Sequence, residues 1–255
     1  MSTDHQIVHG EALQWLRSLP DACADAVITD PPYSSGGMFR GDRAMGTAEK
    51  YAIGGVSFRP DFCGDTRDQR SFMAWCTLWL HEALRVTRSG GALLMFTDWR
   101  QLPVATDAVQ CGGWVWRGIG VWDKRCGKPN KGGFARDCEF IVHATAGAVG
   151  RFTDIDLPCL RGVLPHTIRQ SDKHHQTGKP TQLLRELCGL APPGGLILDP
   201  FAGSGTTIVA AALEGRRAWG CELSREYCSV AQQRIAEVVD MRGTAEQAGL
   251  FEAAP

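Results

Sequence analysis

The stretch Ala26–Tyr33, with the sequence A-V-I-T-D-P-P-Y, is the most informative part of the chain. Its first three residues are apolar and two of them are β-branched, which is typical of a buried strand. The strand must end at Pro31-Pro32, because neither proline can donate a backbone N–H to a neighbouring strand. The turn then presents the Asp30 carboxylate, several carbonyls and the Tyr33 ring, a combination that suits a planar group carrying an amine. An ordinary surface turn with a capping Asp is the alternative.

The composition limits the class of protein. A chain of 255 residues can form one large α/β domain or two small ones. The formal net charge of −1 gives no overall field that attracts nucleic acid, so such binding would need local basic patches. The ten cysteines include no C-x-x-C pair, which argues against a zinc site. Without a signal peptide or a long apolar run, we expect a cytoplasmic protein with reduced thiols and no membrane partner.

Strands and helices are predicted to alternate along most of the chain. Short apolar runs predict strands over 6–8, 26–28, 92–96, 114–122, 138–144, 196–198 and 218–221. Apolar residues spaced by three and four predict helices over 12–19, 68–88, 102–110, 181–190, 206–214 and 224–239. This alternation favours parallel pairing of the strands. We therefore expect a single domain over residues 1–240, followed by a flexible tail over 241–255.

A second informative stretch, Asp199–Thr207, reads D-P-F-A-G-S-G-T-T and lies between a predicted strand and a predicted helix. Gly203 and Gly205 allow the backbone to approach a ligand closely, and the helix N-terminus at Thr206 offers free N–H groups. Glu222, at the end of the next predicted strand, can accept hydrogen bonds from both hydroxyls of a ribose. Together these features indicate the start of a nucleotide-binding α/β sheet.

The glycine loop distinguishes among nucleotide ligands. A phosphate-binding loop would place Lys where Thr206 follows the last glycine, so ATP is disfavoured. A dinucleotide fingerprint would place a third glycine where Ile208 stands, which weakens the case for NAD without excluding it. Asp199 would repel phosphates and attract an ammonium group. A ligand with a ribose, an ammonium and a carboxylate indicates S-adenosylmethionine, whereas a purely structural glycine turn is the alternative.

The two motifs together resemble those of the amino-group DNA methyltransferases. Asp30-Pro31-Pro32-Tyr33 matches their D/N/S-P-P-Y/F catalytic motif, and Asp199–Thr207 is similar to their cofactor motif over its whole length. The order, with the catalytic motif first, resembles the permuted β group, over about residues 7–240. The resemblance implies the Rossmann-like class I methyltransferase fold, circularly permuted. This fold is a seven-stranded, mostly parallel sheet with helices on both faces, and 114–122 and 138–144 would form its antiparallel pair.

The resemblance also implies roles for individual residues, with S-adenosylmethionine as the cofactor. Both motif loops follow predicted strands, so we expect them at one edge of the sheet. Lys179-Pro180 matches the end of an H-P-T-Q-K-P segment, from which Gln176 and Gly178 depart. The expected catalytic residues are Asp30, Pro31, Pro32 and Tyr33. The expected cofactor-binding residues are Glu11, Asp30, Lys179, Asp199, Phe201, Ala202, Gly203, Gly205, Thr206, Thr207, Glu222 and Leu223.

Two loop-rich insertions, 34–67 and 124–180, are expected to recognise DNA. They combine basic residues with glycines and aromatics, which suits contact with phosphates, although solvated loops without a partner are the alternative. Their histidines have no regular ligand spacing, so no metal site is expected. The candidate DNA-binding residues are Arg40, Arg43, Lys124, Arg125, Lys128, Lys131, Arg136, Arg161 and Arg169.

The activity implied by the resemblance is methyl transfer to the exocyclic amine of a base flipped out of double-stranded DNA. Asp30 and the Pro31 carbonyl would accept the two N–H groups, which directs the nitrogen lone pair at the methyl group, while Tyr33 stacks on the base. Asp rather than Ser at position 30 favours adenine N6. Cytosine N4 remains an alternative, and a catalytically silent DNA-binding subunit is an alternative of another class. A homodimer and a partner restriction nuclease stay open.

Overall fold

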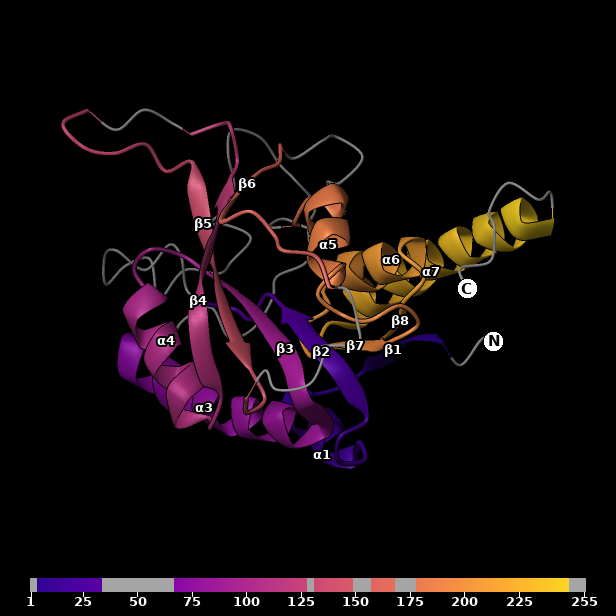
Figure 1. Cartoon of the computed structure of the whole chain (residues 1–255), viewed down its shortest axis with the longest axis horizontal. Helices are drawn as coiled ribbons and strands as arrows, with labels where there is room; N and C mark the ends of the chain where they lie inside the picture. The colour runs from indigo at the N-terminus through magenta and orange to yellow at the C-terminus, as the bar shows by residue number, and fades with distance from the viewer. Residues whose placement is uncertain (1–3, 34–66, 128–130, 149–156, 168–177, 248–255) are drawn as a thin grey trace.

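The computed structural model describes residues 4–33, 67–127, 131–148, 157–167 and 178–247, which form an α/β sandwich around one sheet (Figure 1). The strands of the sheet lie in the order β1-β8-β7-β2-β3-β5-β4-β6. The strands are β1 (His5–His9), β2 (Ala24–Thr29), β3 (Thr87–Thr97), β4 (Val115–Asp123), β5 (Cys138–Thr145), β6 (Val163–Pro165), β7 (Leu196–Asp199) and β8 (Arg217–Glu222). The helices are α1 (Ala12–Ser18), α3 (Gln69–Val86), α4 (Leu102–Cys111), α5 (Thr181–Cys188), α6 (Thr206–Leu213) and α7 (Arg225–Gln247).

The expected class of fold is confirmed by the pairing of the strands. From β1 through β8, β7 and β2 to β3, every neighbouring pair is parallel. β5 then runs antiparallel to both β3 and β4, so the antiparallel pair expected over 114–122 and 138–144 is present. The structure adds a strand to the seven expected, because the short β6 pairs in parallel with the outer side of β4.

Helices cover both faces of the sheet, as Figure 1 shows, and this explains why the strands read as continuous apolar runs. Successive side chains of a strand point to opposite faces. Val27 of β2 and Leu93 of β3 pack in the core beside α1, α3 and α4. Ile28 and Leu94, one position further along, pack in the other core beside α5, α6 and α7. All four side chains are almost completely buried, so each face of the sheet contributes to a separate apolar layer.

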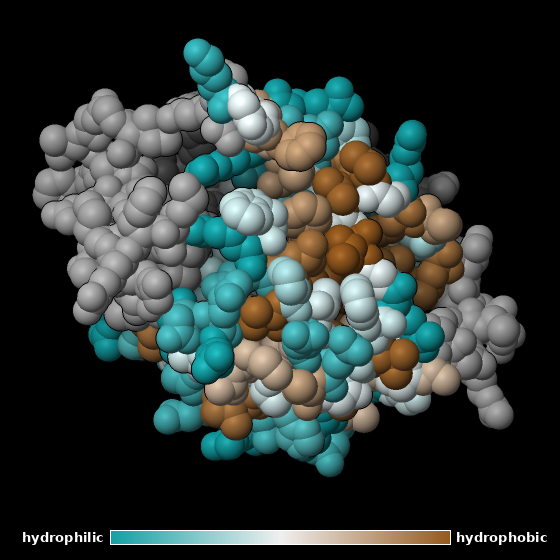
Figure 2. Space-filling view, turned by 90° about the vertical axis from the view of Figure 1, so that its left-hand side faces the viewer, coloured by the Kyte–Doolittle hydropathy of each residue, from teal (hydrophilic) through white to brown (hydrophobic). Residues whose placement is uncertain are grey.

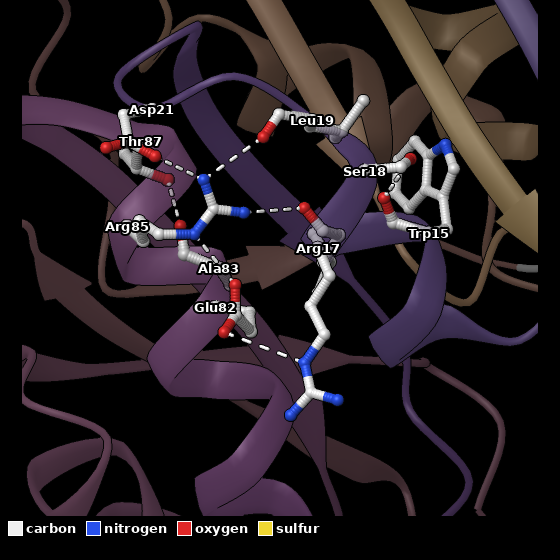
Figure 3. Close-up of polar contacts among 10 residues, drawn as sticks. Trp15, Arg17, Ser18, Leu19, Asp21, Glu82, Ala83, Arg85 and Thr87 are labelled. Carbon is white, nitrogen blue, oxygen red and sulfur yellow. Dashed lines mark hydrogen bonds and ion pairs between the residues drawn. The ribbon is translucent and has the colours of Figure 1, made fainter.

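Arg85, near the end of α3, connects this helix by hydrogen bonds to the C-terminal end of α1 (Figure 3). Its guanidinium donates to the carbonyls of Leu16 at 2.9 Å and Leu19 at 3.1 Å. It also donates to Glu82 at 2.8 Å and pairs with Asp21. The last carbonyls of a helix lack the usual intrahelical donors, and Arg85 supplies donors at this end of α1, where the carbonyl of Leu16 also accepts from the backbone N–H of Leu19.

The antiparallel side of the sheet carries exposed apolar residues. Figure 2 views the molecule from the side of α4 and the β4–β5 pair, and it shows hydrophobic side chains gathered in the middle of this face. On β4, Val115, Trp116 and Ile119 are exposed by 38%, 42% and 38%. Within the described ranges, none of the helices combines the length and the apolar composition that crossing a membrane requires.

Candidate active site

The carboxyl ends of four parallel neighbours, β1, β8, β7 and β2, lie along one edge of the sheet. In this order they bring Glu11, Glu222, Asp199 and Asp30 to that edge. β2 and β7 are adjacent, and the hydroxyl of Thr29 donates a 2.7 Å hydrogen bond to Oδ1 of Asp199. The two sequence motifs therefore meet at one edge, as expected from the parallel pairing.

The buried side chain of Asp199 stabilises the loop that begins at this residue. It accepts hydrogen bonds from the Thr29 hydroxyl and, at 3.1 Å, from the backbone N–H of Phe201. Burial raises the pKa of Asp199 to about 6, the hydrogen bonds from Thr207, Thr29 and Phe201 oppose this rise, and the charge of Asp30 adds to it. The hydrogen bond from Thr29 therefore links the two motifs through Asp199.

Glu222 connects the end of β8 to the glycine loop. One carboxylate oxygen accepts from the backbone N–H of Gly203 at 2.9 Å, and the other accepts from Ser224 at 2.7 Å. Burial raises the pKa of Glu222, and the hydrogen bonds from the backbone of Ser224, Gly203 and Leu223 oppose this rise. Leu223, by contrast, is 53% exposed. The acid expected to bind ribose thus also fixes the position of the loop beside it.

Gly205 joins the loop to α6 in a backbone conformation that favours glycine. Its φ is +78°, in the left-handed region. A Cβ at this position would lie 2.8 Å from the Cβ of Ala231 on α7, which is closer than real contacts allow. Arg234, one turn further along α7, donates to the carbonyl of Ser204 at 2.5 Å and to the hydroxyl of Thr206 at 3.2 Å. α7 therefore supports the loop from behind by packing and by hydrogen bonds.

Phe201 lies on aromatic residues of α3. Its ring centroid is 5.3 Å from that of Trp75 and 5.1 Å from that of Trp79. The guanidinium of Arg67 lies 4.2 Å from the centroid of the Trp75 ring. The next residue, Ala202, is 6% exposed and donates from its backbone N–H to the carbonyl of Cys221. Ring packing therefore holds this side of the loop in place.

Lys179 lies against Asp30. Its ammonium is 2.5 Å from Oδ2 of Asp30 and 3.2 Å from Oε2 of Glu139, and its side chain is 5% exposed. Burial alone would lower the pKa of Lys179, but the charges of Asp30 and Glu139 outweigh this effect and raise it. Lys179, which was expected near the cofactor, is thus a direct partner of the first motif.

Glu139, at the start of β5, is the site residue that the sequence did not single out. It accepts a 3.1 Å hydrogen bond from the hydroxyl of Tyr33, and its second oxygen lies 2.7 Å from the ammonium of Lys124. Burial would raise the pKa of Glu139, but the charges of Lys179 and Lys124 lower it overall. The one available signal in the sequence was an acid at the start of an otherwise apolar strand, directly after the basic loop.

The remaining expected residues differ in their surroundings. Glu11 caps α1 by accepting a 2.9 Å hydrogen bond from the backbone of Gln14. Lys124 is paired with Glu139, and Arg125 is paired with Asp123 at 2.8 Å. The DNA-binding candidates that are exposed among the described residues are Arg125, Lys131, Arg136 and Arg161. The candidates that lie outside the described residues are Arg40, Arg43, Lys128 and Arg169.

Comparison with known protein families identifies the class to which this fold and site belong. The family model described as DNA methylase, covering the N6 and N4 methyltransferases, matches residues 24–158 and 154–233. Because the match covers most of the chain, this protein belongs to that family of DNA methyltransferases.

Individual relatives agree with this assignment. The chain is 28% identical over 239 residues to the "Putative methylase YubD" of Escherichia coli (strain K12), with 91% of each chain covered. Its fold is similar to that of TTHA0409 from Thermus thermophilus, with a TM-score of 0.68, 23% identity and coverage of 92% of this chain and 96% of that one. It is also similar to the fold of the cytosine-N4-specific PvuII DNA methyltransferase, with a TM-score of 0.67, 15% identity and coverage of 94% and 92%.

Proposed function

We propose that this protein is a site-specific DNA methyltransferase that moves the methyl group of S-adenosylmethionine to the exocyclic N6 of an adenine flipped out of double-stranded DNA. The proposal rests mainly on one observation: the Asp30 loop and the Asp199 loop lie side by side, and the 2.7 Å hydrogen bond from Thr29 to Asp199 joins them. This arrangement sets an acceptor-rich turn, suited to an amine, beside a glycine loop, suited to a nucleoside.

The groups around the glycine loop fit S-adenosylmethionine. A carboxylate offers about four lone-pair sites, and the backbone of Gly203, Ser224 and Leu223 donates to those on Glu222. The acceptor capacity that remains can serve a ribose hydroxyl, while the first N–H groups of α6 can bind a carboxylate. TTHA0409, whose fold is similar, is also known as a complex with S-adenosylmethionine, with a TM-score of 0.65, which supports this cofactor. Bound here, it supplies an electrophilic methyl group.

The residues of the first motif prepare the amine for attack. The lone pair of an exocyclic amine is delocalised into the base, which makes the nitrogen a poor nucleophile. Asp30 and the Pro31 carbonyl accept its two N–H groups and favour a pyramidal nitrogen whose lone pair points at the methyl group. The nitrogen supplies the electron pair of the new bond, and the sulfur retains the electrons of the broken one. The methylated nitrogen becomes acidic only then, so its proton passes to Asp30 or water without a strong base.

The choice of base is the finer part of the proposal. Asp at position 30 favours adenine N6. Cytosine N4 is the second candidate, because the cytosine-N4-specific PvuII enzyme has a similar fold with a TM-score of 0.67. Tyr33 is buried beside Asp30 and can stack on either base, so stacking does not distinguish them.

The proposal is tested by expressing the protein in a host without DNA methylation and sequencing the native DNA for modified bases. We expect N6-methyladenine at one short sequence motif, and unmodified DNA with Asp30→Ala. N4-methylcytosine would replace the adenine assignment with the second candidate. Unmodified DNA with the wild-type protein, despite measurable S-adenosylmethionine binding, would favour a silent DNA-binding subunit instead.

A further inference from the structure

Glu139 contacts three residues of the site from a strand that neither sequence motif includes. It lies at the beginning of β5. Because β5 is antiparallel to β3, this end of β5 lies at the same edge of the sheet as the carboxyl ends of β2 and β3. From there it reaches Lys179, Tyr33 and Lys124 at 3.2, 3.1 and 2.7 Å. Its side chain is 15% exposed, so these contacts replace most of its contact with water.

We infer that Glu139 is a positioning residue for methyl transfer: it is the second counter-ion of Lys179, and by sharing that ammonium it leaves more of the negative charge of Asp30 for the amine of the target base. The inference rests on the proposed function, since it assigns the acceptor role to Asp30. It adds a residue that the motifs do not contain.

The effect of Glu139 follows from the contact at Asp30. The carboxylate that is expected to accept the amine already binds Lys179 at 2.5 Å through Oδ2. A carboxylate offers about four lone-pair sites, so the amine can bind Asp30 without displacing Lys179. An ammonium that is attracted to a second carboxylate neutralises less of the Asp30 charge than one that binds Asp30 alone.

Glu139 is the second anion at this ammonium. The Lys179 ammonium carries three N–H donors, and its distance of 3.2 Å from Glu139 is within ion-pair range, so it can bind both carboxylates at once. The ring centroids of Phe96 and Trp122 lie 5.1 and 5.9 Å from the ammonium.

Charge balance supports the same assignment. Two carboxylates, Asp30 and Glu139, face two ammonium groups, Lys179 and Lys124, so the four charges cancel. If Glu139 became neutral, the site would carry a net positive charge and Lys179 would bind Asp30 alone. Asp30 would then be less available to the amine.

The test uses Glu139→Gln in the full chain. Glutamine keeps the size of the side chain and an oxygen that accepts from the Tyr33 hydroxyl, so it removes chiefly the charge. Single-turnover methyl transfer is measured with saturating S-adenosylmethionine and DNA that contains the site found by sequencing. We expect a rate about 10- to 100-fold below wild type with unchanged S-adenosylmethionine affinity, and partial recovery in Glu139→Asp. Glu186→Gln is the matched control, because Glu186 pairs with His166 instead.

A wild-type rate in Glu139→Gln, or a loss explained entirely by weaker cofactor binding, would overturn the inference. A second measurement does not depend on activity. In urea unfolding, Glu139→Gln should lower the midpoint more in the wild-type background than in Lys179→Met, where only Lys124 loses its partner. Equal shifts in both backgrounds would also overturn the pairing. If the wild-type protein methylates no DNA, the proposed function fails, and this unfolding cycle still decides whether Glu139 and Lys179 are coupled.

Discussion

The hydroxyl of Thr29, at the end of β2, donates a 2.7 Å hydrogen bond to the carboxylate of Asp199, at the end of β7. This bond joins the last residue of one central strand to the last residue of its neighbour. Each of these residues directly precedes a functional loop, so the bond fixes the distance between the amine-binding turn and the nucleoside-binding turn. The relative position of the two loops is therefore set inside the sheet rather than by the loops themselves.

The raised pKa of Asp199 predicts a pH-dependent stability. Burial raises the pKa of this carboxyl to about 6, whereas a free Asp titrates near about 3.9. The folded state therefore binds the proton more tightly, and this contribution to stability, about 3 kcal/mol, is present below about pH 4 and lost as pH rises to about 6. Asp199→Asn should remove this loss, so the variant gains stability relative to wild type over that range. Urea unfolding at several pH values measures the difference, and a difference that is constant with pH would contradict the prediction.

Asp30→Asn should slow methyl transfer without weakening the binding of the cofactor. The amide keeps one acceptor oxygen but loses the charge, and Lys179 then pairs with Glu139 alone. We expect methyl transfer to fall on the order of 10³-fold, because the charge is needed as the transition state becomes cationic. S-adenosylmethionine affinity, measured by titration calorimetry, should stay close to that of wild type. Turnover at the wild-type rate would show that Asp30 does not act on the amine.

Gly205→Ala should disrupt the cofactor loop more than backbone strain alone predicts. Gly205 has φ +78°, and an added Cβ would lie 2.8 Å from the Cβ of Ala231. Gly132 provides a matched control, since it has the same φ of +78° but no atom within 4 Å of an added Cβ. Gly132→Ala should cost about 1–2 kcal/mol of unfolding free energy. Gly205→Ala should cost more than this and weaken S-adenosylmethionine binding, and equal costs in the two variants would rule out a role for the α7 contact.

Arg85→Met should loosen the attachment of α1 to α3. The change removes the donors to the carbonyls of Leu16 and Leu19 and the pair with Glu82, while it retains most of the apolar stem. We expect a loss of about 2–3 kcal/mol in the free energy of unfolding. Arg17→Met is the control, because Arg17 is 60% exposed and lies 3.8 Å from Glu82, so its loss should cost under about 1 kcal/mol. Similar midpoints for the two variants in urea would contradict this role of Arg85.

The sheet could be predicted from the sequence because its signals are local. Val27 and Ile28 belong to a short apolar run, and such runs arise when both faces of a strand are buried. β6 gave no such signal, because it has three residues and is defined by backbone pairing with β4, as at Val121 and Val163. β6 forms by pairing with the outer edge of β4, and this edge exists only once the sheet has folded.

The two motifs and Lys179 were visible in the sequence, but Glu139 and the contacts among these residues were not. Asp30 and Asp199 lie in conspicuous loops directly after apolar strands. Glu139 becomes part of the site only because β5 is antiparallel and brings its first residues to the same edge. The contact of Lys179 with Asp30 likewise depends on how three distant segments approach one another, for which no local pattern exists.

The loop between β4 and β5 should contribute to DNA affinity without setting the sequence that is recognised. Lys131 and Arg136 are exposed there, whereas Lys124 is already paired with Glu139. Because phosphate contacts release counterions, Lys131→Ala combined with Arg136→Ala should weaken binding to every DNA sequence and reduce the salt slope by about 2.

Fluorescence anisotropy over a salt series measures that slope. Arg17→Ala is the control, because Arg17 lies near the end of α1, away from the edge that carries the site, and it should leave the slope unchanged. The methylated sequence, read from native DNA, should be the same in the double variant as in wild type, since phosphate contacts carry no base information. An altered recognition sequence would mean that these side chains reach base edges, and an unchanged slope would mean that the loop does not touch the backbone of DNA.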